Sequence, residues 1–73
     1  MSSESNQIAD DLRSVAERIA DEAIATLRNA MRADSEEEQA ELRKVEKRLT
    51  RARRSVEKAI SLLDDVDSGE DDS

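Results

Sequence analysis

A row of basic side chains is the feature of this sequence that is best suited to binding chemistry. The stretch KRLTRARRSVEK, residues 47–58, holds six basic residues and one acid, although the whole chain has a formal charge of −7. At helical spacing these cations line up along one face, where they suit the phosphates of a nucleic acid or the carboxylates of an acidic protein. The same row also suits a helix face that is simply solvated, which is the interpretation we favour. This basic row consists of Lys44, Lys47, Arg51, Arg54 and Lys58.

The composition excludes most catalytic and metal sites. The chain has no His and no Cys, so zinc sites, His-based catalytic triads and haem ligation by either residue are ruled out. Asp65, Asp67 and Asp71 have part of the spacing of a calcium-binding loop, but Gly69 comes one position too early for it. The acidic triplet at residues 36–38 fits a helix N-terminus better than a cation site. We therefore predict a protein that is not an enzyme and has no cofactor and no metal site.

The elements that carry the basic row are expected to be long helices. The chain has 73 residues, no Phe, Trp, Tyr or Pro, only one Gly, and 42% charged residues. Strands would need β-branched or aromatic residues and turn residues, which are scarce here. The composition therefore predicts an all-α protein.

The first helix is predicted over residues 6–33, after a flexible N-terminus at 1–5, with Ser5 as its N-cap. Its apolar residues follow one another three or four positions apart, as the stripe of an amphipathic helix does. A row of alanines at 9, 16, 23 and 30 runs beside this stripe and would let another helix approach closely. The stripe consists of Ile8, Leu12, Val15, Ile19, Ala23 and Leu27.

A turn is predicted at residues 34–35 and a second helix at 36–66. Ser35 followed by Glu38 is a capping box for the new helix, and Arg28 suits the C-terminus of the preceding one. The apolar positions of the second helix alternate three and four apart, which is a heptad pattern. They are Leu42, Val45, Leu49, Ala52, Val56 and Leu63, together with Ala59 and Val66. Residues 67–73 are acidic and are predicted to form a disordered tail.

Two helices of similar length joined by a short turn predict an antiparallel, coiled-coil-like hairpin in which Ile19 meets Leu49 and Leu12 meets Val56. The combined apolar stripes, which we call the predicted seam, are wider than one partner helix can cover. We therefore expect a homodimer that forms a four-helix bundle. In overall plan, with a short hairpin, a polar turn and an acidic tail, the chain resembles the Rop family of RNA-binding dimers. This resemblance is architectural and implies no functional residue.

The expected function is that of a small interaction or assembly protein that acts through the predicted seam, with a second copy or another helical protein as its partner. The alternative is a small regulatory hairpin that binds RNA or DNA through the basic row. The acidic charge is concentrated in the tail, because residues 64–73 hold six acids and no base. With no apolar run long enough to span a membrane and no signal-peptide pattern at the N-terminus, a cytoplasmic protein without a membrane partner is expected.

Overall fold

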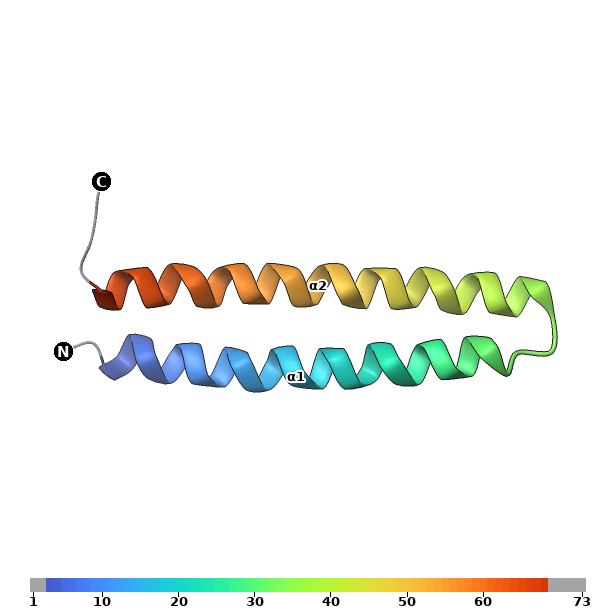
Figure 1. Ribbon diagram of the computed structural model, residues 1–73, viewed down its shortest axis with the longest axis horizontal. Coiled ribbons are helices and arrows are strands. Elements are labelled where there is room, and N and C mark those ends of the chain that lie inside the picture. Colours follow the sequence, from blue (N-terminus) through green and yellow to red (C-terminus); the bar gives the residue numbers. More distant parts are fainter. Residues whose placement is uncertain (1–2, 69–73) are drawn as a thin grey trace.

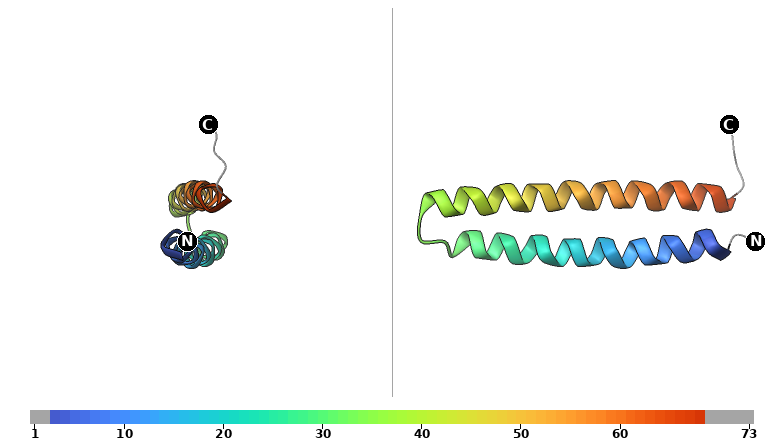
Figure 2. Two further views of the ribbon diagram at one scale, coloured as in Figure 1. Left: turned by 90° about the vertical axis from the view of Figure 1, so that its left-hand side faces the viewer. Right: turned by 180° about the vertical axis from the view of Figure 1, so that it is seen from behind.

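Two long helices form an antiparallel hairpin in the computed structural model of the chain (Figure 1). Helix α1 spans Ser3–Met31 and helix α2 spans Glu36–Ser68. The structure describes the backbone of residues 3–68 and the side chains of residues 4–64. The end-on view shows the two helices alone, packed side by side (Figure 2). The prediction of an all-α chain with two helices packed on each other is thus confirmed.

The helix ends differ from the predicted boundaries by two or three residues. Helix α1 begins at Ser3 instead of residue 6, so Ser5 lies inside the helix and is not its N-cap. Glu4 in the first turn favours this start, since an acid stabilises a helix N-terminus. Helix α2 begins at Glu36 as predicted and continues to Ser68, two residues beyond the predicted end. Residues 1–2 and 69–73, which belong to the predicted flexible ends, lie outside the described residues.

Local hydrogen bonds define the C-terminus of α1 and the N-terminus of α2. The Arg32 amide donates to the carbonyls of Arg28 and Asn29, both at 3.1 Å, and the Ala33 amide donates to Ala30 at 3.3 Å. The bonds to Asn29 and Ala30 reach only the third preceding residue, which tightens the chain and explains why α1 ends at Met31, before the predicted residue 33. The hydroxyl of Ser35 then accepts a bond of 3.1 Å from the amide of Glu38. This is the bond by which the predicted capping box starts the second helix.

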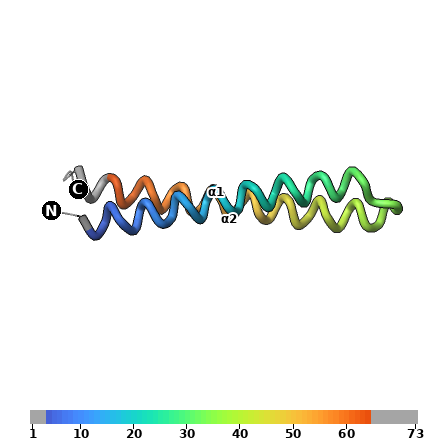
Figure 3. Tube along the Cα trace, turned by 90° about the horizontal axis from the view of Figure 1, so that it is seen from below, coloured from blue at the N-terminus to red at the C-terminus, as the bar shows by residue number. Residues whose placement is uncertain are grey.

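The two helices touch along one row of positions each, which we call the inner rows. Both rows alternate three and four residues apart, so each returns to the same side of its helix along its whole length. Seen edge-on, the helices cross at a shallow angle near the middle of the hairpin, which keeps the rows in contact (Figure 3). The inner row of α1 is Ala9, Leu12, Ala16, Ile19, Ala23, Thr26 and Ala30, and that of α2 is Leu42, Glu46, Leu49, Arg53, Val56, Ile60 and Leu63.

The hairpin interior is made mainly of small side chains. The buried apolar residues are Ala9, Ala16, Ala30 and Ile60, and Thr26 is the buried polar one. Among the described residues, no large side chain is fully buried, and half of the large apolar ones are exposed. Alanines on α1 let the helices approach closely, but they contribute little apolar area to a core. The hairpin by itself therefore has only a thin core.

Candidate interaction site

The inner rows divide the surface of the hairpin into two broad faces. A residue that follows an inner-row position by one is rotated about 100° to one side, and a residue that precedes it is rotated to the other. Arg13 follows Leu12, Asp64 follows Leu63, and these two charged side chains meet across the helices. Residues that follow inner-row positions therefore share one face of the hairpin. By the same geometry, residues that precede Ala9, Ala16, Glu46, Arg53 and Ile60 share the opposite face.

The face marked by Arg13 and Asp64 is polar. Nη2 of Arg13 lies 3.1 Å from Oδ2 of Asp64, and Nη1 lies 2.9 Å from Oδ1 of Asp10. A shallow groove on this face is lined by Arg13, Ala16, Glu17, Ala20, Arg53, Glu57 and Ile60. Basic and acidic side chains alternate around it, so the half of this face toward the chain ends is well adapted to water. We call it the polar face.

The opposite face is largely apolar, and we call it the apolar face. Ile8 is 48% exposed, Val15 38% and Val45 41%. Ala52 is also exposed and Ala59 half-buried, so that, with Val45, α2 contributes apolar residues at three successive heptads of this face. A second groove, lined by Val15, Arg18, Ile19, Glu22 and Leu49, lies on the same side of α1. The apolar face is defined by Ile8, Val15, Val45, Ala52 and Ala59, with the outer edges of the partly buried inner-row residues between them.

The predicted seam is therefore split by the structure into two sets. Leu12, Ile19 and Ala23 of α1 and Leu42, Leu49, Val56 and Leu63 of α2 lie in the inner rows. Ile8, Val15, Val45 and Ala52 lie on the apolar face, beside the contact between the helices and not within it. Ile19 and Leu49, which were predicted to meet, line the same groove. Leu27 is exposed on the polar face near Ile24 and Met31, at the turn end of α1.

The split shows that the apolar stripe of α2 is not centred on α1. Its middle lies between the leucine positions of the inner row and the row of Val45, Ala52 and Ala59. A helix in a two-stranded pair needs only two apolar positions per heptad, whereas a helix of a four-helix bundle has a third on one flank. The stripe of α2 has the third position, and it turns toward the apolar face.

Polar residues occupy several inner-row positions, which the sequence patterns did not reveal. Thr26 of α1 is buried. Within α2, the hydroxyl of Thr50 donates to Oε2 of Glu46 at 2.9 Å. Nε of Arg53 is shielded from solvent and lies 3.4 Å from Oε2 of Glu57, without the geometry of a hydrogen bond. Arg53 lines the groove on the polar face together with Glu17 of α1. The polar residues Gln39, Glu46 and Arg53 recur every seven residues, and this recurrence is the sequence signal that could have placed them on the inner side of α2.

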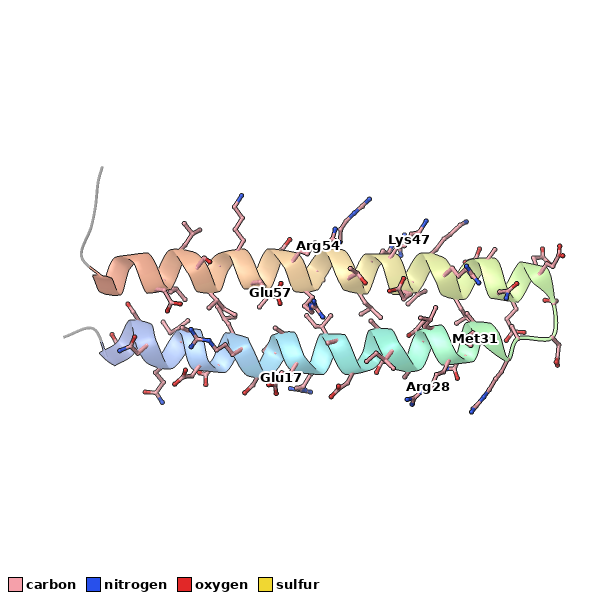
Figure 4. All side chains as sticks on the ribbon, in the orientation of Figure 1. Glu17, Arg28, Met31, Lys47, Arg54 and Glu57 are labelled. Atoms are coloured by element: carbon pink, nitrogen blue, oxygen red, sulfur yellow. The ribbon has the colours of Figure 1, made fainter. Side chains whose placement is uncertain are left out.

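The basic row lies on the outer edge of α2. All five of its residues are exposed, and Figure 4 shows Lys47 and Arg54 pointing away from α1. Glu17 and Arg28 lie along the opposite outer edge, on α1. Of the row, Lys44 makes an ion pair, 3.6 Å from Glu41; none of the other four makes one with any described side chain. The row was predicted to face outward, and it does.

Other kinds of site find little support in the described part of the chain. Among the side chains of residues 4–64, no group of three or more acidic residues is arranged to hold a metal ion. Neither described helix is long and apolar enough to cross a membrane. No protein-family model matches the sequence, and neither a curated protein nor a solved structure gives a significant match.

Proposed function

We propose that the chain is a small, non-enzymatic helical interaction protein that works by burying its apolar face against other helices. The observation that carries this proposal is the packing of α1, which buries Ala9 and Ala16 against α2 while the larger Ile8 and Val15 stand exposed on the apolar face. A single 73-residue hairpin with so thin a core has little stability of its own. Covering the apolar face adds the missing core, because each Å² of apolar surface removed from water contributes about 25 cal/mol.

The simplest assembled form is a homodimer in which two hairpins make a coiled-coil-like four-helix bundle. Most soluble oligomers are symmetric, and a twofold dimer needs only one self-complementary face. The apolar face offers such a surface on both helices of the same hairpin. The broad side of the hairpin measures 53 by 22 Å between extreme Cα atoms, which is enough for the roughly 800 Å² that each partner contributes to a standard interface.

Two isoleucines of α1 provide a matched test of this proposal. Ile8 and Ile24 are 48% and 52% exposed, but Ile8 lies on the apolar face and Ile24 on the outer edge toward the polar face. At micromolar concentration the chain should sediment with twice its mass of 8.2 kDa and melt at a higher temperature as its concentration rises. Ile8→Ser should weaken the association, and Ile24→Ser should leave it unchanged. Equal effects of the two substitutions, or a stable monomer, would contradict the proposal.

A second candidate function is the binding of RNA or DNA along the basic row. The observation in its favour is the exposure of all five cations, four of which make no ion pair with the described side chains. A row at this spacing can follow a phosphate backbone. Against it, the chain has no aromatic side chain on which bases could stack, and its overall charge is −7. We therefore rank this function second.

A further inference from the structure

The apolar face is not the same along its length. On α1 its positions recur every seven residues as Ile8, Val15, Glu22 and Asn29, so the half near the chain ends is apolar and the half near the turn is polar. On α2 the corresponding positions are Glu38, Val45, Ala52 and Ala59, which are small near the chain ends. A partner of this face must therefore match two gradients along the hairpin, the change from apolar to polar residues on α1 and the change in side-chain size on α2.

Only two arrangements stack two such faces around a twofold axis. With the axis along the helices, the two turns lie at the same end and α1 packs on α2 of the second copy. With the axis across the helices, the turns lie at opposite ends and α1 packs on α1 of the second copy. The two arrangements bring different halves of α1 into contact, so the gradients distinguish them.

With the turns at the same end, large residues meet small ones. Ile8 and Val15 pack over the half of the second copy's α2 that carries Ala52 and Ala59, so bulky side chains fill the space above alanines. Interdigitation of large and small residues is how helical cores reach native packing density. Glu22 and Asn29 then lie over the half of the second copy's α2 that carries Val45 and Glu38, so the polar residues gather near the turn, away from Ile8 and Val15.

With the turns at opposite ends, polar residues are forced onto apolar ones. The half of α1 that carries Glu22 and Asn29 would then cover Ile8 and Val15 of the second copy. Both polar side chains are exposed in the hairpin and would lose water on association. Burying an unpaired carboxylate is costly, and it would occur twice in a symmetric dimer.

From this comparison we infer that the partner of the apolar face is a second copy of the chain, packed with both turns at the same end of the bundle. The inference rests on the proposed function, since it specifies the partner and the orientation for the same face. It places α1 of each copy antiparallel to α2 of the other, so that every helix has two antiparallel neighbours. The outer edges of α2, with the basic row, remain uncovered in this arrangement.

Distance measurement between spin labels tests the orientation directly. The chain has no Cys, so Asp34→Cys in the turn gives one label per copy, at an exposed position whose side chain makes no hydrogen bond or ion pair with a described residue. With turns at the same end, the two labels should be about 15–30 Å apart, because neighbouring helices lie roughly 8–10 Å from each other. With turns at opposite ends, the distance should approach the 53 Å length of the hairpin.

A label near the middle of α1 serves as the control. Ser14→Cys, on the outer edge, should give a distance well below the 53 Å length of the hairpin in both arrangements and therefore reports dimer formation alone. A short distance for Ser14→Cys with a long one for Asp34→Cys would overturn the orientation and leave the proposed function intact. Loss of the dipolar signal from both labels, together with a monomer mass, would overturn the inference and the homodimer together.

Discussion

Ala9 is 1% exposed against α2, whereas the larger Ile8 beside it is 48% exposed on the apolar face. The same relation recurs one heptad later, where Ala16 is buried and Val15 is exposed. Close approach of two helix backbones requires small residues between them, so the alanines occupy the contact and the branched residues are displaced to its flank. This relation carries the proposed assembly, and it also predicts how substitutions on the two flanks should differ.

Enlarging an inner-row alanine should destabilise the hairpin. Ala16→Leu adds three carbon atoms where the helices are closest, and overpacking of this kind usually costs about 1–3 kcal/mol. Ala40→Leu, at an exposed position of α2, should change the free energy of unfolding by less than about 0.5 kcal/mol. Urea unfolding of the two variants at one protein concentration measures the difference. If both variants were as stable as the parent chain, the close contact along the alanine row would be wrong.

A leucine shared by both contacts should be among the most sensitive positions. Leu49 lies in the inner row and also lines the groove on the apolar face, so Leu49→Ala should cost about 2–5 kcal/mol, the usual range for a buried leucine. Arg51→Ala, on the outer edge, should cost less than about 0.5 kcal/mol. Thermal melts followed by circular dichroism compare the two. Identical melting temperatures would contradict the placement of Leu49.

The sequence was sufficient to predict the helices and the turn but not the direction in which each helix faces. Helical periodicity and the cap at Ser35 are local properties, and both reappear in the structure. The contact between the helices is not local: it was placed at the centre of each apolar stripe, yet it lies to one side of that centre. A stripe that serves two neighbours has its centre between them, and periodicity alone does not reveal where each neighbour lies. The row of alanines at 9, 16, 23 and 30 was the better guide to the inner side of α1.

Replacing the polar inner-row residue Glu46 should stabilise the assembly. Its carboxylate is half-buried and is bonded to Thr50, whereas most facing residues of α1 are apolar. Glu46→Leu removes the partial desolvation of a charge and extends the apolar row, and substitutions of this class commonly add about 0.5–2 kcal/mol. Glu41→Leu, which alters an exposed acid of the same helix, should give no such gain. Chemical denaturation measures both, and a loss of stability for Glu46→Leu would mean that the polar pair is needed for folding.

The ion pair between Arg13 and Asp64 should contribute little to stability. Both side chains are 50% exposed, and pairs of this kind are worth about 0.2–1 kcal/mol. A double-mutant cycle with Arg13→Gln and Asp64→Asn isolates the coupling energy, because each substitution keeps a polar side chain of similar size. The coupling should fall further in 1 M salt, where the screening length is about 3 Å. A coupling well above 1 kcal/mol would indicate that the polar face is buried in the assembled protein.

The second candidate function can be decided by titrating the chain with duplex RNA and duplex DNA. If the basic row engages four or five phosphates, the logarithm of the binding constant should fall with the logarithm of salt concentration with a slope of about −3.5 to −4.5. Replacing Lys47, Arg51 and Arg54 together with Gln should flatten that slope by about 2.7, since each phosphate contact contributes about 0.9. The matched control replaces Arg18, Arg28 and Arg32 of α1 with Gln, which changes the net charge equally but leaves the basic row intact.

A shortened chain gives a second test of nucleic-acid binding. Deleting residues 69–73 removes three acids and spares Asp64, so it should strengthen any binding by removing a tethered competitor. Equal weakening by the two triple variants would attribute the binding to net charge alone. We expect neither the full chain nor the shortened one to bind at low salt, which would leave the basic row as a solvated edge of the bundle.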